Sequence, residues 1–193
     1  LRAADLQLEK FIPAAVLAAV STIAPASETD AACVLLTGAN GFLGRFLALE
    51  QLKRLSVNGG KLICIARGAD DASARSRLLE SFAGGDDALL RDIERLAEGR
   101  LEVLAGDLAK PHLGLPEKIW LRLADEVDLV VHPAALVNHK LPYSQLFRPN
   151  VAGTATLIEL AVTTRLKRVL HISTVAAAMN VGAPATEEAD IRD

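Results

Sequence analysis

Residues 33–45 read CVLLTGANGFLGR, and this stretch decides how the rest of the sequence is interpreted. An apolar run leads into Gly38, Gly41 and Gly44, spaced three apart, and a helix-forming stretch follows. One glycine permits a tight turn, another lets a pyrophosphate approach the backbone, and the last lets helix and strand pack closely. A helix that begins near Phe42 offers unpaired N–H groups to phosphates. The stretch predicts a dinucleotide-binding turn; the alternative is an ordinary glycine-rich connection.

Beyond residue 30, short apolar runs alternate with helical patterns. The predicted strands are Val34–Thr37, Leu62–Ala66, Leu101–Ala105, Leu129–His132 and Val169–Ser173. The predicted helices are Leu43–Ser56, Ser73–Ala97 (broken into two at the sequence GGDD), Glu117–Ala124 and Tyr143–Thr164. The strands are continuously apolar, as is typical of strands covered on both faces. This alternation predicts an α/β fold, a doubly wound parallel sheet of the Rossmann type in the order 3-2-1-4-5.

The two ends of the chain differ from this pattern. Residues 1–30 are expected to form a helical linker, interrupted near Pro13. The side chains expected on one side of it are Leu6, Phe11, Val16, Leu17 and Val20. The acidic residues before its apolar part and its short length argue against a signal peptide or a membrane span. Residues 31–193 form the predicted dinucleotide-binding domain, with a loop beyond the fifth strand.

The composition excludes some classes of function. The 193 residues carry a formal net charge of −3, the basic residues are scattered, and only 4% are aromatic, so nucleic acid is not an expected partner. Cys33 and Cys64 lie inside apolar runs and are expected to be buried core residues. No cysteine or histidine spacing indicates a metal site. This pattern fits a reducing, cytoplasmic setting.

The end of the second predicted strand bears on which dinucleotide binds. An NAD site favours an acidic residue about 20 residues after the turn, but this position holds Arg67. A guanidinium suits the 2′-phosphate of NADPH, which a carboxylate repels. Arg77 is a second candidate for the phosphate or an ordinary solvated charge on a helix. NADPH is therefore the predicted cofactor, with Asp70 and Asp71 as the residues that argue against it.

Residues after the third and fourth strands complete the predicted cofactor site. Asp107 either accepts a hydrogen bond from the adenine amino group or caps the turn that follows it. The small residues Ala134 and Ala135 leave room for the ribose and the nicotinamide, whereas His132 is expected to be packed or hydrogen-bonded. The full set of expected cofactor contacts is Thr37, Gly38, Asn40, Gly41, Phe42, Leu43, Gly44, Arg67, Arg77, Asp107, Leu108, Ala134 and Ala135.

Three polar residues are candidates for a catalytic site. Ser173 and Thr174 end the last predicted strand, where a hydroxyl can hold a substrate carbonyl oxygen; the alternative is that both are ordinary loop hydroxyls. Asn150 follows Pro149 inside a predicted helix, although both residue types disfavour a helix interior. Something local must therefore compensate at Asn150.

Several blocks together resemble a known family. LLTGANGFLG, AGDL, HPAALVNHKLPYSQLFRPNVAGT and HISTVA, in this order, are similar to extended short-chain dehydrogenases/reductases. More narrowly, they resemble the thioester reductase domains that end carboxylic acid reductases and some peptide synthetases. The blocks GGKLICIARG and LVNHKLPYSQLF favour the carboxylic acid reductases, and LRAADLQLEKFI resembles the segment that joins their carrier domain to the reductase.

The resemblance implies a reaction, a partner and site residues. Such domains use NADPH to reduce an acyl thioester, held on a carrier domain's phosphopantetheine arm, to an aldehyde. The family's catalytic Ser/Thr corresponds to Thr174, with Ser173 as its neighbour, and the supporting Asn corresponds to Asn150. The family's Tyr-x-x-x-Lys pair has no counterpart, because Tyr143 is the single tyrosine and Phe147 stands four residues later. We therefore expect these 193 residues to bind cofactor but to be inactive alone.

Three other interpretations remain open at the level of the sequence. A sugar-nucleotide epimerase or dehydratase of the same extended group would use NAD and place an acidic residue at position 67. A non-catalytic NADP-binding sensor would lack the Tyr-x-x-x-Lys pair altogether. The segment before residue 27 is also a candidate interface to a carrier domain, which is compatible with the reductase.

Overall fold

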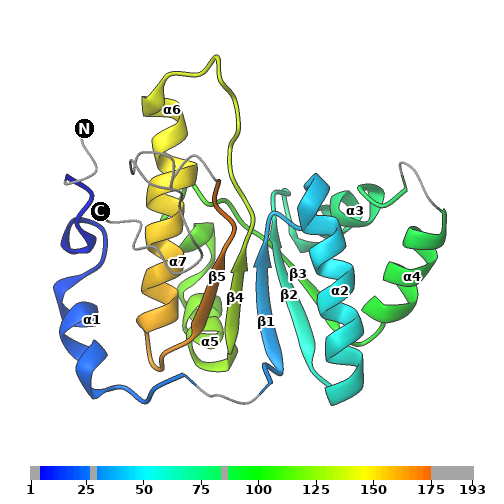
Figure 1. Ribbon diagram of the computed structural model, residues 1–193, viewed down its shortest axis with the longest axis horizontal. Helices are drawn as coiled ribbons and strands as arrows, with labels where there is room; N and C mark the ends of the chain where they lie inside the picture. The colour runs from blue at the N-terminus through cyan, green and yellow to red at the C-terminus, as the bar shows by residue number, and fades with distance from the viewer. Residues whose placement is uncertain (1–4, 27–29, 84–86, 175–193) are drawn as a thin grey trace, which may run out of the picture.

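The computed structural model describes residues 5–26, 30–83 and 87–174, and its centre is one parallel sheet (Figure 1). The strands are β1 (Cys33–Thr37), β2 (Lys61–Ala66), β3 (Leu101–Ala105), β4 (Leu129–His132) and β5 (Arg168–His171). They lie in the order β3-β2-β1-β4-β5, and every neighbouring pair is parallel. The predicted doubly wound sheet is confirmed. The strand predicted over Val169–Ser173 is wrong at both ends, because the ladder between β4 and β5 pairs Leu129 with Arg168 and stops at His171.

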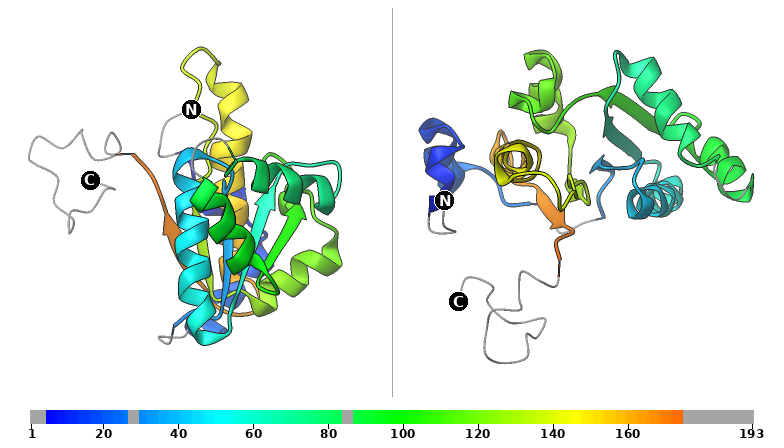
Figure 2. Two further views of the ribbon diagram at one scale, coloured as in Figure 1. Left: turned by 90° about the vertical axis from the view of Figure 1, so that its right-hand side faces the viewer. Right: turned by 90° about the horizontal axis from the view of Figure 1, so that it is seen from above.

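Helices cover both faces of the sheet. They are α2 (Phe42–Asn58), α3 (Asp71–Glu80), α4 (Asp87–Ala97), α5 (Glu117–Glu126), α6 (Tyr143–Phe147) and α7 (Gly153–Val162). Figures 1 and 2 show α2, α3 and α4 on one side of the sheet and α5 and α7 on the other. The two helix layers follow from right-handed crossovers on either side of β1.

Alternate residues of the central strand enter two separate cores. Val34 and Leu36 pack in the core beneath α2, α3 and α4, whereas Cys33 and Leu35 pack in the core beneath α5 and α7. All four side chains are at most 6% exposed. Since successive side chains of a strand point to opposite faces, a strand covered on both faces is apolar at every position. The continuous apolar runs of the sequence have this origin.

The predicted helix over Tyr143–Thr164 is instead three elements. A short α6 leads into a π-helical turn, Arg148–Ala152, and the α-helix resumes as α7. Pro149 cannot donate a backbone hydrogen bond and crowds the preceding turn, so the chain widens there rather than continuing as a regular α-helix. The predicted break at GGDD is confirmed, because α3 and α4 are separate helices.

The N-terminal segment is less helical than predicted. It contains a 3₁₀ turn over Leu8–Lys10, a short helix α1 (Ala14–Ala19) and a second 3₁₀ turn over Val20–Thr22. Pro13 stands at the N-cap of α1, so the residues before it do not share one helical register with those after it. Leu6, expected on the packed face, is 39% exposed, and Ile12 is the residue that is buried.

This segment packs beside α6 and α7. The ring of Phe11 lies 6.1 Å from the ring of Phe147 in α6, and the Leu166 N–H donates to the Ala24 carbonyl. Helix α1 also contacts α7. The loop predicted beyond the fifth strand lies outside the described residues.

Polar contacts join the elements at the amino ends of the strands. The Asp128 carboxylate, just before β4, accepts hydrogen bonds from the backbone N–H groups of Ala32 and Cys33 at 2.9 and 2.8 Å. It also pairs with Arg165 at 2.8 Å. Burial opposes ionisation, but these hydrogen bonds outweigh it and hold the pKa of Asp128 below its usual range. One carboxylate therefore connects β1, β4 and the segment that leads to β5.

A second group of charges lies at the same edge of the sheet. Lys61, the first residue of β2, pairs with Glu126 of α5 at 2.8 Å. Arg122 of α5 pairs with Glu126 at 2.7 Å and with Glu102 of β3. Ion pairs thus connect β2, β3 and α5 at this edge, while Asp128 separately connects β1 and β4 to the segment before β5.

Candidate cofactor site at the carboxyl edge of the sheet

A cavity of about 650 Å³ extends across the carboxyl ends of β1, β2, β3 and β4. Ligands of open α/β sheets bind at this edge, where the strand order reverses between β1 and β4. Its walls come from the turn after β1, the loops after β2, β3 and β4, and helix α6. The predicted cofactor residues in its lining are Gly38, Asn40, Gly41, Arg67, Asp107, Leu108, Ala134 and Ala135.

Gly38 and Gly44 meet the steric requirements of a tight turn that packs closely against a helix. Gly38 has a left-handed φ of +66°, and a Cβ there would lie 2.8 Å from the Cα of Ala134. A Cβ on Gly44 would lie 1.9 Å from the Gly38 carbonyl oxygen, so the start of α2 and the turn touch backbone to backbone. Gly41 is the N-cap of α2, lines the cavity and supplies no capping side chain. The first N–H groups of α2 therefore suit the phosphates of a dinucleotide.

Four predicted contacts from this region lie outside the lining of the cavity: Thr37, Phe42, Leu43 and Gly44. Thr37 is only 1% exposed, and its hydroxyl is hydrogen-bonded to His132 at 2.7 Å. Phe42 and Leu43 are 79% and 46% exposed, and the Phe42 ring packs edge-on against Phe46. Both stand in the first turn of α2 with exposed side chains, so their backbone N–H groups are what they offer a cofactor.

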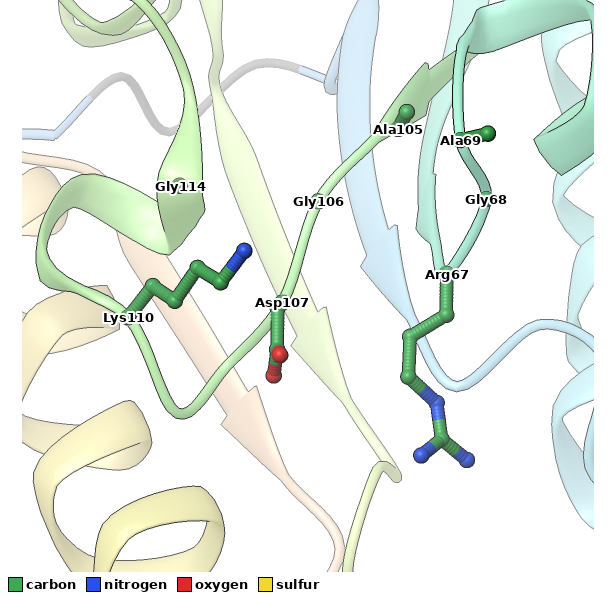
Figure 3. A pocket seen from close by; sticks show the side chains of 8 residues that line it. All are labelled: Arg67, Gly68, Ala69, Ala105, Gly106, Asp107, Lys110 and Gly114. Carbon is green, nitrogen blue, oxygen red and sulfur yellow. The ribbon is translucent and has the colours of Figure 1, made fainter.

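Arg67 is shared between the large cavity and a smaller one of about 290 Å³ (Figure 3). The smaller cavity lies between the loop after β2 and the loop after β3, and in the view of Figure 3 the Asp107 carboxylate stands between the ends of Arg67 and Lys110. Arg77, the other predicted phosphate ligand, is exposed on α3 and lines neither cavity. Lys110 was not predicted, because no motif in the loop AGDLAK indicates it.

The two carboxylates that argued against NADPH are both engaged outside the two cavities. Asp70 caps α3: its side chain accepts from the Ser73 N–H at 2.7 Å, and the Ser73 hydroxyl accepts from the Asp70 N–H. The hydrogen bond from the Ser73 backbone lowers the pKa of Asp70. Asp71 accepts from the Ala105 N–H at 2.7 Å. Arg67 is therefore the charged side chain that the loop after β2 gives to the cavities.

Asp107 fits both interpretations of its role. Its carboxylate accepts from the Ala109 N–H at 2.9 Å and so caps the local turn, and it also lines both cavities. The Asp107 N–H donates to the Leu113 carbonyl at 2.7 Å, which closes the loop on itself. His112 and Leu113 have left-handed φ angles of +48° and +59°, a conformation that costs free energy in residues with a Cβ. This strained closure holds Asp107 and Lys110 at the cavity.

His132 is buried at the end of β4, as the sequence analysis expected of a hydrogen-bonded residue. It is 1% exposed, with Nδ1 2.7 Å from the Thr37 hydroxyl and Nε2 3.1 Å from the Thr154 hydroxyl. Burial, aided by His171 at 5.0 Å between ring centroids, lowers the pKa of His132 to about 4. The imidazole is thus neutral near pH 7.

Two side-chain hydrogen bonds compensate for the unfavourable position of Asn150 inside a helix. It lies in the π-helical turn, where its side-chain oxygen accepts from the Leu136 N–H at 2.7 Å and its amide donates to the Leu136 carbonyl at 3.0 Å. Leu136 belongs to the loop after β4 and lines the large cavity. Asn150 therefore supports the wall of the cavity rather than facing it.

The candidate catalytic hydroxyls stand beyond β5. Ser173 and Thr174 are exposed, and neither lines the two cavities. The Ile172 N–H donates to the His132 carbonyl, so the backbone directly before Ser173 is hydrogen-bonded to the end of β4. Tyr143 is half-exposed on α6 with its ring 5.8 Å from Phe147, and its neighbours Ser144, Gln145 and Arg148 line the cavity instead. These three residues follow one another at helical spacing, so a helical pattern over residues 144–148 predicts that they share one face.

Comparison with known proteins defines the class. A family model described as "Male sterility protein", an NAD-binding family, matches residues 36–192, and the chain belongs to this family. It is 56% identical, over its full length, to a carboxylic acid reductase of Segniliparus rugosus, of which it spans 16%.

Solved structures narrow the likeness to one domain type. The reductase (R) domain of a nonribosomal peptide synthetase from Mycobacterium tuberculosis superimposes with a TM-score of 0.90 at 49% identity, over 100% of this chain and 45% of that one. A thiolation-reductase di-domain from an archaeal non-ribosomal peptide synthetase has a TM-score of 0.62 at 25% identity, over 90% of this chain and 42% of that one. The predicted resemblance to a reductase domain is confirmed.

The residues present fit a nicotinamide dinucleotide. The close backbone approach at Gly38, the uncapped start of α2 and the cavity across the strand ends are features that suit such a cofactor. Within residues 5–26, 30–83 and 87–174, no three side chains form a group suited to a metal ion. No helix in the same residues is long and apolar enough to span a bilayer.

Proposed function

We propose that the protein containing this chain uses NADPH to reduce an acyl thioester, carried on the phosphopantetheine arm of a carrier domain, to an aldehyde. The observation that carries the proposal is the large cavity, which combines the glycine turn after β1 with Arg67, and no carboxylate, at the end of β2. The names of the similar proteins, carboxylic acid reductase and synthetase reductase domains, support the reaction.

Each part of the site has a role in this reaction. When bound, the reduced nicotinamide supplies the hydride that reduces the thioester carbonyl. The start of α2 holds the pyrophosphate, Arg67 pairs with the 2′-phosphate, and Asp107 accepts from the adenine amino group. Ala134 and Ala135 leave room beside β4 for the ribose and nicotinamide. NADPH rather than NADH is favoured because Arg67 offers two parallel hydrogen bonds to a phosphate.

Thr174, with Ser173 beside it, is the proposed hydrogen-bond donor to the thioester carbonyl oxygen. Such a bond strengthens as negative charge develops on that oxygen during reduction. A proton then neutralises the oxygen, and the resulting hemithioacetal breaks its carbon–sulfur bond to give aldehyde and free thiol. The Tyr-x-x-x-Lys pair expected of the family has no counterpart in the 193 residues, so we propose that they bind cofactor but do not turn over alone.

The carrier domain is the proposed partner, on the same parent chain. The archaeal di-domain, which joins a thiolation domain to a reductase, supports this arrangement. Residues 1–30 are then the linker that follows the carrier, and residues 31–193 belong to the NADPH-binding domain. A reducing, cytoplasmic setting is part of the proposal and is supported by the unpaired, buried thiols of Cys33 and Cys64.

The test uses the full-length protein with an acyl-pantetheine thioester. NADPH oxidation and aldehyde formation are followed together, and the assay is repeated with NADH. It is also repeated with the variants Thr174→Ala and Ser173→Ala. Thr22→Ala, which removes an exposed hydroxyl just after α1, is the control. We expect thioester-dependent aldehyde, a preference for NADPH, and a rate loss of about 10²-fold or more in Thr174→Ala alone. Tight NADPH binding without aldehyde would favour the sensor. A preference for NADH would favour the sugar-nucleotide enzyme.

A further inference from the structure

A chain of hydrogen bonds runs beneath the cofactor cavity from β1 to the π-helical turn. Thr37 contacts Nδ1 of His132 at 2.7 Å, Nε2 of His132 contacts the Thr154 hydroxyl at 3.1 Å, and that hydroxyl donates to the Asn150 carbonyl at 2.6 Å. Thr37 immediately precedes Gly38, and Asn150 supports the opposite wall. The chain therefore joins the glycine turn to the helix that closes the other side of the cavity.

The donors and acceptors fix the direction of this chain. A hydroxyl has one proton, and the proton of Thr154 is used on the Asn150 carbonyl. Thr154 must then accept from His132, which places the imidazole proton on Nε2. A neutral imidazole with its proton on Nε2 has an acceptor at Nδ1, so Thr37 donates there. Only one placement of the protons lets the hydroxyls and both ring nitrogens form all of these hydrogen bonds. That placement requires a neutral histidine, which agrees with its burial.

The hydrogen bonds that begin at Thr37 end in the π-helical turn, where the helix is widest. In a π-helical turn the backbone pairs shift from i+4 to i+5, and the Thr154 hydroxyl supplies the Asn150 carbonyl with a donor from the i+4 residue. This turn and Gly153, the first residue of α7, contact two walls of the cavity. Asn150 binds both backbone groups of Leu136, and a Cβ on Gly153 would lie 2.8 Å from the Leu108 carbonyl oxygen. Leu136 and Leu108 both line the cavity.

We infer that Thr154, held in place by His132, is a positioning residue for the cofactor cavity: its hydroxyl sets the width of the π-helical turn, so that Asn150 fixes the loop after β4. The inference rests on the proposed use of this cavity for NADPH. Thr154 does not line the cavity; it acts through Asn150 and Leu136.

Helix α7 provides a matched control. The Thr156 hydroxyl, two residues on, donates to the Ala152 carbonyl at 3.0 Å in the same i−4 pattern, is half-buried, and has no contact with His132. Thr154→Val and Thr156→Val each replace a hydroxyl by a methyl group of similar size. Thr154→Ser restores the hydroxyl without the methyl group.

Two measurements on the full-length protein test the inference. The first is the Kd for NADPH from its fluorescence, and the second is hydrogen exchange, by mass spectrometry, in the peptide that covers residues 134–141. Thr154→Val should raise the Kd and the exchange rate by about five- to tenfold, the effect of one buried hydrogen bond. Thr154→Ser and Thr156→Val should stay within about twofold of the wild type. If Thr154→Val does not fold, Thr154→Cys, with its weak S–H donor, replaces it.

The outcomes separate this inference from the proposed function. Equal exchange rates in Thr154→Val and Thr156→Val would overturn the positioning role, and so would faster exchange with an unchanged Kd. Exchange requires no cofactor, so it decides the hydrogen-bond chain even if the protein prefers another dinucleotide. The aldehyde assay decides the reaction and is unaffected by the result for Thr154.

Discussion

A Cβ on Gly38 would lie 2.8 Å from the Cα of Ala134, so the turn after β1 and the loop after β4 touch backbone to backbone. These two segments belong to strands that are neighbours in the sheet but distant in the sequence. Their contact sets the floor of the large cavity at the point where the strand order reverses. A side chain at position 38 must displace one of the two walls.

We therefore expect Gly38→Ala to weaken NADPH binding by at least about tenfold, because Ala134 must move out of a wall of the cavity. Gly59→Ala is the matched control: Gly59 also has a left-handed φ, +72°, but nothing lies within 4 Å of its Cβ position. Both variants should lose about 1 kcal/mol of stability from the strained φ. Fluorescence titration with NADPH checks the difference, and similar Kd values for the two variants would contradict it.

Arg67→Leu should lower the affinity for NADPH about 10- to 100-fold and leave that for NADH unchanged, because only NADPH carries the phosphate that pairs with the guanidinium. Arg77→Leu is the control, since Arg77 is exposed on α3 outside both cavities. Titrations of both variants with NADPH and with NADH give, for each variant, the ratio of the two Kd values. A change in the Arg77 variant as large as in the Arg67 variant would restore the sequence-based role of Arg77.

Lys167 should make stability depend on pH in the alkaline range. Its ammonium donates to the Thr163 and Arg165 carbonyls at 2.8 and 2.9 Å, and burial, aided by the charge of Arg165, lowers the pKa of Lys167 to about 8. The unfolded chain holds that proton up to about pH 10.4. Between these values the unfolded state binds more protons, so the contribution of Lys167 to stability rises with pH; below pH 8 it is flat.

The measurement compares thermal midpoints of the wild type and Lys167→Met from pH 7 to 10. The thermal midpoint of the wild type should rise relative to that of Lys167→Met above pH 8. Effects of pH that both proteins share cancel in this difference. The exposed Lys53→Met gives the baseline. A difference that is constant across this range, as for Lys53, would show that Lys167 keeps its proton in the fold.

Cys33 and Cys64 should resist thiol reagents while the protein is folded. Burial raises the pKa of each thiol to about 12, although Lys61 opposes this at Cys33. At pH 8 the reactive thiolate is then about one part in ten thousand. Peptide mass spectrometry after iodoacetamide treatment should find both cysteines unmodified, and both alkylated in urea. Modification of Cys64 in the folded protein would require an opening of the core between the sheet and α2.

The order of the sheet and its glycine turn were predictable because they depend on local signals. Continuous apolar strands imply two covered faces, and Gly38, Gly41 and Gly44 each meet a steric requirement of the turn. The ends of β5 were not predictable in this way. Its residues are exposed at an edge, so hydrophobicity does not mark where its pairing with β4 stops.

The cavity residues that the sequence missed depend on tertiary contacts. Lys110 reaches the cavity because its loop, which contains two non-glycine residues with left-handed φ angles, folds back on Asp107. No sequence motif predicts that conformation. Arg148 lines the cavity as the first residue of the π-helical turn, where the sequence pattern predicted a regular helix. The interruption expected near Pro13 is present, since Pro13 separates the 3₁₀ turn over Leu8–Lys10 from α1, whereas Leu6, expected on the packed side, is exposed.

The ion pairs at the amino edge of the sheet have a mechanical consequence for the cavity at the opposite edge. Asp128 and Arg165 connect β1, β4 and the segment before β5, while Lys61, Glu126 and Arg122 connect β2, α5 and β3. The amino ends of the strands therefore cannot separate without breaking several charged contacts. The loops at the carboxyl ends of the strands, which form the cavity, can adjust to a dinucleotide without breaking any of these contacts.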